Sequence, residues 1–227
     1  MSYETETRAA YRNASRATRY HRDQRQALTW GRVVTWRQQR RVRAELQRHE
    51  WSPDDRLLDV PCGSGVLGPS LAGVAARVTA GDISSEMMTL ARGEYPASRF
   101  AGFAQLDITA MPFADGAFRC GVVLGFMHRV PAEIRLAALD ELHRVVSEWI
   151  VVSYSVNDAW QHLKRRLLRL LRPGYLPAPN PVRRADIEHE LAAAGFVVRQ
   201  AFPTLPLLSA EMVFVAERHG GAERSGS

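Results

Sequence analysis

The chain has 227 residues, a formal net charge of +6 at pH 7 and a hydrophobic content of 46%. This length is enough for one α/β domain with a full core and a modest appendage, and the hydrophobic content argues against a disordered chain. The two cysteines, Cys62 and Cys120, form no C-x-x-C pair, which argues against a disulfide framework and a structural zinc site.

No apolar run reaches the roughly 18 residues of a membrane-spanning helix. The first residues, Met-Ser-Tyr-Glu-Thr-Glu-Thr-Arg, lack the apolar segment of a secretory signal. We therefore expect a cytoplasmic protein with no membrane span and no resident metal ion.

Residues 1–50 are predicted to be mostly helical and to form an N-terminal helical cap. They contain twelve arginines and five acidic residues, an excess of seven positive charges. Several of the arginines recur at the spacing of one helix face: Arg8, Arg12, Arg16 and Arg19. The simpler interpretation is a solvated cationic face, and the sharper one is a surface for an acidic substrate, nucleic acid or anionic lipid.

Residues 56–72 predict a strand, a glycine turn and a helix. The apolar run from Leu57 to Val60 contains one acid, Asp59, and is followed by Pro-Cys-Gly-Ser-Gly and then by apolar residues at helical spacing. The glycines of this turn, Gly63 and Gly65, let the backbone bend sharply and let a ligand approach it. Such turns lie at the carboxyl end of a parallel sheet, where folds of this class bind their ligands.

Two cofactor classes use such a turn. Gly63-Ser-Gly-Val-Leu-Gly68 reads as the G-x-G-x-x-G of dinucleotide sites, with Asp82 about 20 residues further on. However, Leu-Asp-Val-Pro-Cys-Gly-Ser-Gly resembles the first motif of the class I methyltransferases that depend on S-adenosylmethionine (SAM). Asp59 favours the second class, because a carboxylate just before the turn would repel a pyrophosphate, whereas SAM has no phosphate and its methionine end carries an ammonium group.

Two further acids follow predicted strands. Residues 77–84 predict a strand that ends in Asp82, whose carboxylate can accept two hydrogen bonds from a ribose diol. Residues 100–108 predict the next strand, and the acid near its end, with the Pro-Phe turn and Asp-Gly after it, again resembles the methyltransferase pattern. The resemblance implies that Asp107 accepts a hydrogen bond from the adenine amino group and that Ile108 packs on the ring. The alternative is that Asp107 is only a turn residue.

Residues 120–126 predict the fourth, central strand, which leads to His128. In many members of the family that this sequence resembles, the matching segment carries histidines that face the methyl group. The resemblance therefore implies His128 as a catalytic base or an acceptor-positioning residue, and a buried histidine without a proton role is the alternative. A helix is predicted up to Val146, and residues 149–154 predict the fifth strand.

Residues 158–172 form the most amphipathic stretch of the sequence. Trp160, Leu163 and Leu167 belong to one apolar stripe, and basic residues occupy much of the remaining circumference. The simpler interpretation is a helix packed on the core or forming a lid over the substrate. The alternative is an interfacial helix at a lipid surface, with peripheral membrane contact.

The last predicted elements are a helix over residues 182–194 and two strands over residues 197–202 and 211–216, followed by a disordered tail over residues 219–227. The predicted fold class is α/β: a doubly wound, mostly parallel seven-stranded sheet with a C-terminal antiparallel hairpin and the N-terminal helical cap. The resemblance implies that residues 51–218 form the SAM-dependent methyltransferase domain.

The resemblance also implies the site residues. The expected cofactor site for SAM consists of Asp59, Pro61, Cys62, Gly63, Ser64, Gly65, Asp82, Ile83, Asp107, Ile108 and Leu124. The expected acceptor site, drawn from the N-terminal segment and from the region after the fifth strand, consists of Tyr11, Tyr20, His21, Tyr154 and His162.

The implied function is transfer of a methyl group from SAM to a small-molecule acceptor by in-line displacement, and a lipid-like or aromatic acceptor agrees with the amphipathic stretch. Two alternatives stay open. One is an RNA-directed methyltransferase, suggested by the cationic N-terminal segment. Against a nucleic-acid partner, the residues after the fourth strand read Gly-Phe-Met-His instead of the N/D-P-P-Y-type signature of amino-directed enzymes. The other is a NAD-binding oxidoreductase or a non-catalytic nucleotide-binding module.

Overall fold

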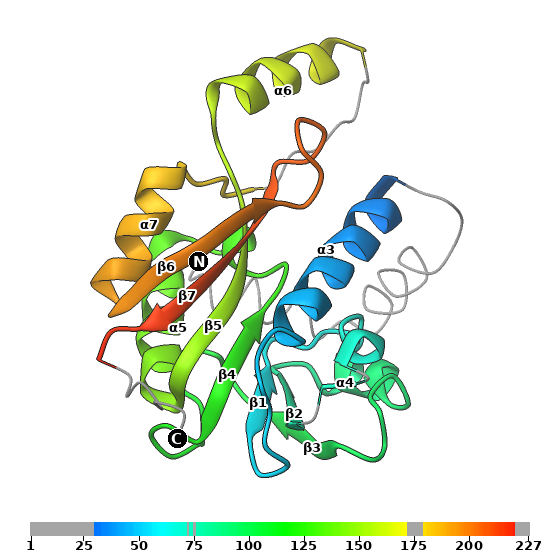
Figure 1. Cartoon of the computed structure of the whole chain (residues 1–227). Helices are drawn as coiled ribbons and strands as arrows, with labels where there is room; N and C mark the ends of the chain where they lie inside the picture. Colours follow the sequence, from blue (N-terminus) through cyan, green and yellow to red (C-terminus); the bar gives the residue numbers. More distant parts are fainter. Residues whose placement is uncertain (1–29, 72, 75, 172–178, 221–227) are drawn as a thin grey trace.

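The computed structural model describes residues 30–71, 73–74, 76–171 and 179–220 (Figure 1). In this part of the chain, seven strands form one sheet in the order β3-β2-β1-β4-β5-β7-β6. The strands are β1 (Arg56–Asp59), β2 (Arg77–Asp82), β3 (Phe100–Gln105), β4 (Phe118–Val123), β5 (Val146–Ser155), β6 (Phe196–Pro203) and β7 (Glu211–Arg218).

The strands from β1 to β5 are parallel to their neighbours, whereas β7 runs antiparallel to both β5 and β6. The prediction of a mostly parallel sheet closed by an antiparallel hairpin is thus confirmed. The central strands are buried on both faces, as parallel strands between two helix layers are, and β1 and β2 each expose only their first residue.

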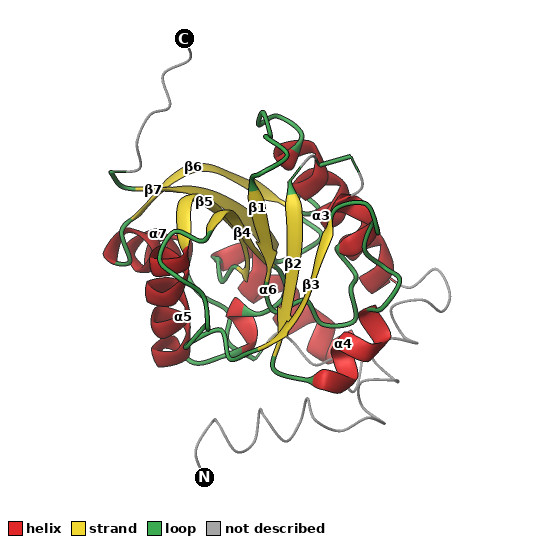
Figure 2. Ribbon diagram, turned by 90° about the horizontal axis from the view of Figure 1, so that it is seen from below, coloured by secondary structure: helices red, strands yellow, loops and turns green. Residues whose placement is uncertain are grey.

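Helices cover both faces of the sheet (Figure 2). On one face, Leu139 of α5 and Ile187 of α7 belong to one buried cluster. On the other face, Leu46 of α3 and Met88 of α4 belong to a second cluster. This confirms the doubly wound arrangement. The helices are α3 (Trp30–Leu46), α4 (Ser85–Ala91), α5 (Ala132–Val145), α6 (Ala159–Leu171) and α7 (Arg184–Ala193), with two 3-10 helices, η1 (Gly68–Leu71) and η2 (Met127–Arg129).

The helix predicted after the glycine turn is largely wrong, because the chain forms only η1 there. Pro69 lacks the N–H that the interior of a longer helix needs. Gly73 then adopts φ +91°, a left-handed conformation that ends helical chain. The consequence for the site is that no long helix starts at the glycine turn.

α6 follows β5 and lies beyond the carboxyl ends of the parallel strands (Figure 1). The Trp160 indole N–H donates to the carbonyl of Leu207 at 2.9 Å, and the Lys164 ammonium donates to the carbonyl of Leu208 at 2.8 Å. These bonds attach α6 to the loop between β6 and β7. No helix among the described residues is both long and apolar enough to cross a bilayer.

Of the predicted N-terminal cap, residues 1–29 lie outside the described residues, as do residues 221–227 of the predicted tail. The described part of the cap is α3, whose Val42 and Leu46 are fully buried in the same cluster as Leu57 of β1. The division into a cap, a methyltransferase domain and a tail stays a prediction.

Candidate cofactor site

The three acids predicted for the cofactor follow three neighbouring strands. Asp59 is the last residue of β1, Asp82 is the last residue of β2, and Asp107 lies just beyond β3. Because β1 pairs with β2 and β2 pairs with β3 in parallel, their carboxyl ends meet at one edge of the sheet. The structure therefore brings all three acids to the edge that carries the glycine turn.

Asp82 fastens the glycine turn to the end of β2. Its Oδ2 accepts a hydrogen bond from the Gly63 N–H at 2.8 Å, and its Oδ1 accepts one from the Ser84 N–H at 2.9 Å. The Asp82 side chain is buried, and burial raises its pKa, while the backbone N–H groups act in the opposite direction. A carboxylate offers about four lone-pair positions, so these two bonds leave room for further donors.

Asp59 is held by a tyrosine that sequence reasoning missed. The Tyr95 hydroxyl donates to Asp59 Oδ2 at 2.7 Å, and both side chains are buried. Burial raises the pKa of Asp59 to about 7; the hydrogen bond from Tyr95 lowers it, and the nearby charge of Asp82 raises it. Tyr95 lies 36 residues from Asp59, and no local spacing connects the two.

The glycines of the turn have different roles. Gly63 has φ +52°, and a Cβ placed there would meet only Met87 Cε, at 3.9 Å. Gly65 has φ +77°, and a Cβ there would lie 2.9 Å from the Cβ atoms of Ala91 and Glu94. Only the first of these glycines leaves open space, so it is the one where a ligand could approach the backbone, whereas Gly65 serves close packing against the end of α4.

Gly68 allows a test of this division. A Cβ at Gly68 would lie 2.5 Å from the Glu94 carbonyl oxygen. We expect Gly68→Ala to reduce the free energy of unfolding by about 2–3 kcal/mol, because backbone atoms must move. We expect Gly63→Ala to reduce the free energy of unfolding by only about 1 kcal/mol, because alanine adopts the left-handed conformation less readily than glycine. Urea denaturation of both variants measures the difference, and equal losses would contradict the assignment of the open space to Gly63.

The other residues predicted for the cofactor site are mostly buried or half-buried. Burial raises the pKa of the Cys62 thiol far above its ordinary value, so the thiol stays protonated at neutral pH. The Ser64 hydroxyl is buried without a hydrogen-bond partner in the described part of the chain. Ile108 is buried in the cluster that faces α5. Three others are half-buried: Pro61, Ile83 and Leu124.

Asp107 has the turn role that was the alternative to adenine binding. Its Oδ1 accepts hydrogen bonds from the Thr109 N–H at 3.0 Å and from the Thr109 hydroxyl at 2.8 Å. The Leu106 N–H donates to the carbonyl of Asp82 at 3.0 Å, which holds this turn beside the second acid. The turn orients Asp107, and the role in adenine binding stays a prediction.

His128 lies in η2, directly after β4, and so comes from the same edge of the sheet. Its Nδ1 is buried without a hydrogen-bond partner in the described residues, and its carbonyl accepts from the Asn180 N–H at 3.0 Å. Burial, with a smaller effect from the adjacent Arg129, lowers the pKa of His128 to about 4. The imidazole is therefore neutral at neutral pH.

The structure does not gather the residues predicted for the acceptor. Tyr154 has no exposed surface and packs edge-on against Phe214 in the core. Strand alternation places it on the α5 and α7 side of the sheet, and its role as an acceptor-pocket residue stays a prediction. His162 is exposed on α6. The remaining predicted residues lie outside the described part of the chain: Tyr11, Tyr20 and His21.

The site has the features that SAM requires more than those of a dinucleotide. A pyrophosphate is bound by the positive end of a helix, but only the four-residue η1 follows the turn, and two carboxylates lie beside it. The open space at Gly63 and the unpartnered Ser64 hydroxyl agree with a ligand that approaches the turn. Among the residues that the structure describes, no group of three histidine, cysteine or acidic side chains could hold a metal ion.

Comparison with solved structures identifies the fold. The magnesium protoporphyrin IX methyltransferase from Synechocystis, in a crystal structure with bound S-adenosylhomocysteine (SAH), aligns over 95% of this chain and 99% of its own with a TM-score of 0.77 and 19% sequence identity. The geranyl diphosphate C-methyltransferase from Streptomyces coelicolor aligns over 78% of each chain with a TM-score of 0.57 and 13% identity. At these identities the likeness concerns the fold, which is that of the class I methyltransferases.

Sequence comparison finds relatives of part of the chain. Residues 57–149 match the family model described as a methyltransferase domain. The 2-phytyl-1,4-naphtoquinone methyltransferase of Synechocystis is 38% identical over 102 residues, which are 42% of each chain. The malonyl-[acyl-carrier protein] O-methyltransferase of Erwinia pyrifoliae is 31% identical over 160 residues, 65% of this chain and 56% of that protein. Residues 57–149 thus match a methyltransferase domain, and the chain spans less than half the length of the first curated relatives that it matches.

Proposed function

We propose that the protein binds SAM at the carboxyl edge of β1, β2 and β3 and transfers its methyl group to a small-molecule acceptor. The observation that carries the proposal is that Asp82 bonds to the turn glycine Gly63 while a second buried carboxylate, Asp59, lies near Asp82 at the same edge. A Cβ added at Gly63 would meet only one side-chain atom, at 3.9 Å. When bound, SAM supplies an already activated methyl group on a sulfonium sulfur. The chain's own task is then to bind SAM and the acceptor, to orient them and to exclude water.

Each acid has a role that follows from its position. Asp82 uses one lone pair on each oxygen for the Gly63 and Ser84 N–H groups, so the other lone pairs can accept from a ribose diol. Asp59 lies just before the turn, where its ionised form would attract the ammonium of the methionine end. Asp107, oriented by Thr109, is the candidate for the adenine amino group.

His128 stays our candidate for positioning the acceptor, because it follows β4 and carries a buried Nδ1 without a partner in the described residues. With a pKa of about 4, the imidazole is a weak base. We therefore assign it the role of a hydrogen-bonding partner of the acceptor and not that of a base that removes a proton. The predicted acceptor residues of the N-terminal segment, Tyr11, Tyr20 and His21, keep their proposed role as part of a cap over the acceptor.

Ligand-induced thermal stabilisation tests the cofactor assignment. A ligand that binds only the folded protein at 100 times its dissociation constant stabilises it by about 2.7 kcal/mol. We expect SAM and SAH to raise the melting temperature and NAD to leave it unchanged. Stabilisation by NAD alone would show a dinucleotide site and overturn the proposal.

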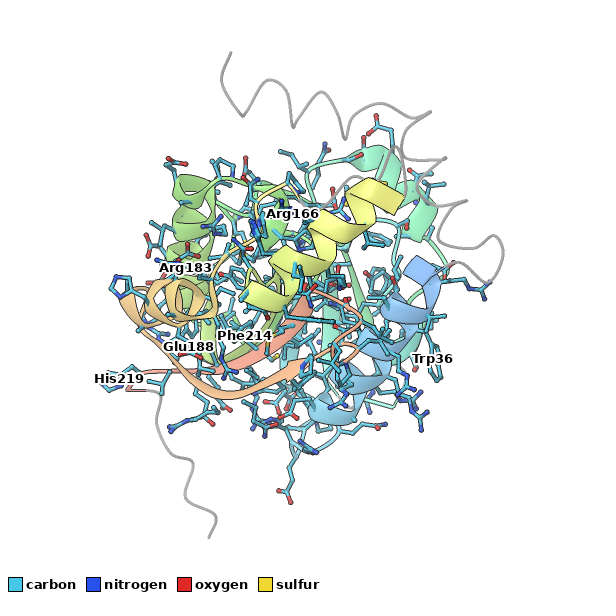
Figure 3. The ribbon with its side chains drawn as sticks, turned by 90° about the horizontal axis from the view of Figure 1, so that it is seen from above. Trp36, Arg166, Arg183, Glu188, Phe214 and His219 are labelled. Carbon is cyan, nitrogen blue, oxygen red and sulfur yellow. The ribbon has the colours of Figure 1, made fainter. Side chains whose placement is uncertain are left out.

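The acceptor class is suggested by an apolar surface near the same end of the sheet. We define the α6 patch by its exposed apolar side chains, Trp160 at 49%, Leu163 at 50%, Leu207 at 70% and Leu208 at 58%. Leu207 adopts φ +61°, an unusual conformation for a bulky residue, and its carbonyl accepts the hydrogen bond from the Trp160 indole. The same helix carries the exposed Arg166 (Figure 3). Apolar side chains beside basic ones are suited to the surface of a membrane with anionic lipids.

We infer that the acceptor is a lipid-like or aromatic molecule and that the α6 patch makes peripheral contact with the membrane that contains it. The names of similar proteins agree with such an acceptor, because they include a phytyl naphthoquinone methyltransferase and a magnesium protoporphyrin methyltransferase. Mass spectrometry of cell extracts with and without the gene would identify the acceptor as the compound whose product is heavier by one methylene unit.

Replacement of the loop tip tests the membrane contact. We expect Leu207→Ser combined with Leu208→Ser to weaken binding to phosphatidylglycerol-containing vesicles about thirtyfold, because roughly 2 kcal/mol of apolar burial is lost. Vesicle co-sedimentation measures this. A matched control is Leu136→Ser combined with Val197→Ser, which removes two exposed apolar side chains on other elements. Equal binding by both double variants would contradict the contact.

A further inference from the structure

A concave surface lies between α3 and the edge strand β6, and none of its lining residues belongs to the candidate cofactor site. Figure 1 shows α3 alongside the β6–β7 hairpin. The groove between them has a volume of about 540 Å³. This volume is within the range of small-molecule sites, which is about 300–1,000 Å³. We call it the arginine groove and define it by its lining residues, Arg37, Arg40, Arg41, Ala44, Glu45, Arg48, Gln200, Ala201 and Phe202.

The arginine groove carries four cations and one anion, and the anion is already paired. Glu45 is buried and accepts a hydrogen bond from Arg48 at 2.8 Å. Among the residues that the structure describes, no acidic side chain forms an ion pair with Arg37, Arg40 or Arg41. Three arginines that line the groove therefore have no ion-pair partner in the described chain.

Aromatic rings hold these guanidinium groups in place without neutralising them. Arg41 lies over the Phe202 ring at 5.5 Å from its centroid, inside the groove. Arg40 and Arg37 lie 5.6 and 5.8 Å from the Trp36 ring centroid, and Trp36 itself is on the outer side of α3 (Figure 3). Stacking restricts a guanidinium while leaving its N–H donors available for an anion.

The positive charges of these arginines repel one another and destabilise α3 when no anion is bound. Arg37 and Arg41 are four residues apart, so they are neighbours on one face with Cα atoms about 6 Å apart along the axis. Like charges at that spacing destabilise a helix. A bound anion would remove the repulsion, and the planar forks of arginine match the oxygen atoms of phosphate groups in particular.

We propose that the arginine groove is a binding site for a small phosphate-bearing molecule, with Arg37, Arg40 and Arg41 as its anion-binding residues. The groove is enclosed on two sides by α3 and β6 and has an aromatic wall, which is suited to a compact ligand more than to a flat bilayer or a duplex. None of the lining residues belongs to the candidate cofactor site, so the proposal does not depend on the proposed methyl transfer.

Calorimetric titration with inorganic pyrophosphate at low ionic strength tests this site. The test variant replaces Arg37, Arg40 and Arg41 together with glutamine; all three are exposed, so the core is untouched. The control variant replaces Arg77, Arg92 and Arg99 with glutamine, which removes the same charge elsewhere. We expect at least a tenfold higher dissociation constant for pyrophosphate in the test variant and less than a threefold change in the control variant.

A single substitution tests the geometry. Arg41→Lys keeps the positive charge but loses the fork and the stacking, and we expect it to weaken pyrophosphate binding by about threefold or more. Two further probes, phosphatidylglycerol vesicles and a single-stranded RNA oligonucleotide, test whether the groove binds the phosphate groups of lipids or of nucleic acid. The proposal is overturned by equal losses in the test and control variants, by no binding of pyrophosphate to the parent protein, or by binding of vesicles or RNA alone through these arginines.

Discussion

Replacing Asp82 with alanine should lower the affinity for SAM at least a hundredfold. The proposed site gives this carboxylate two hydrogen bonds to the ribose diol, and a hydrogen bond to a charged group contributes about 1.5–3 kcal/mol, so at least about 3 kcal/mol is lost. Asp82 also holds the turn in place through the Gly63 and Ser84 N–H groups. Calorimetric titration with SAM and with SAH measures the loss of affinity.

The same variant should also be less stable, and the two effects can be separated. The alanine leaves two backbone N–H groups without their acceptor, which should reduce the free energy of unfolding by about 2 kcal/mol. Urea denaturation without ligand measures this part alone. Asp54→Ala is the matched control, because Asp54 is exposed and lies at the other end of β1. Unchanged SAM affinity in a folded Asp82→Ala protein would remove Asp82 from the ribose site.

Replacing Asp59 with asparagine should abolish a pH dependence of stability. The pKa of Asp59 rises from an ordinary 3.8 to about 7 in the folded protein. Between these pH values the folded protein retains a proton that the unfolded chain has released. The stability contributed by this group is thus complete below about pH 4 and is lost as the pH rises through 7, by about 4 kcal/mol in total.

At pH 8 the Asp59→Asn variant should therefore be more stable than the parent protein by up to about 4 kcal/mol, and at pH 4 the two should be nearly equal. Urea denaturation across this pH range measures the difference. The pKa of Asp82 is raised as well, but Asp82 is present in both proteins, so the comparison isolates Asp59. Equal pH profiles for the two proteins would contradict the buried, protonated state of Asp59.

Two further measurements connect this proton to the ligand. Tyr95→Phe removes the hydrogen bond that lowers the pKa of Asp59, so the pH at which stability is lost should move upward. If the ammonium of SAM lies beside the ionised carboxylate, SAM binding near pH 7 should release up to one proton in the parent protein and none in Asp59→Asn. Calorimetry in buffers of different ionisation enthalpy counts that proton.

The order of the elements was largely predictable from local pattern. Apolar runs gave the strands, and Gly63 and Asp82 were recognisable as a turn and a strand end. These signals depend on residues a few positions apart in the chain, so a single sequence is enough to predict them.

The contacts that complete the site were not predictable in this way. Tyr95 reaches Asp59 across 36 residues. The side of the sheet that Tyr154 faces depends on strand register, which a shift of one residue reverses. The helix expected after the turn is limited to η1 because Pro69 and Gly73 act together with the close packing of Gly68 on Glu94.

By itself the sequence determined the strands, the glycine turn and the three acids at the strand ends, because each is encoded by residues close together in the chain, and its resemblance to a known family supplied the arrangement of the sheet. Only the tertiary structure decided that Asp82 bonds to the turn, that Asp59 is buried against Tyr95 and that arginines of α3 meet Phe202 of β6. The physical reason is that burial, pKa and charge pairing depend on which distant segments pack together, and packing is a property of the whole fold.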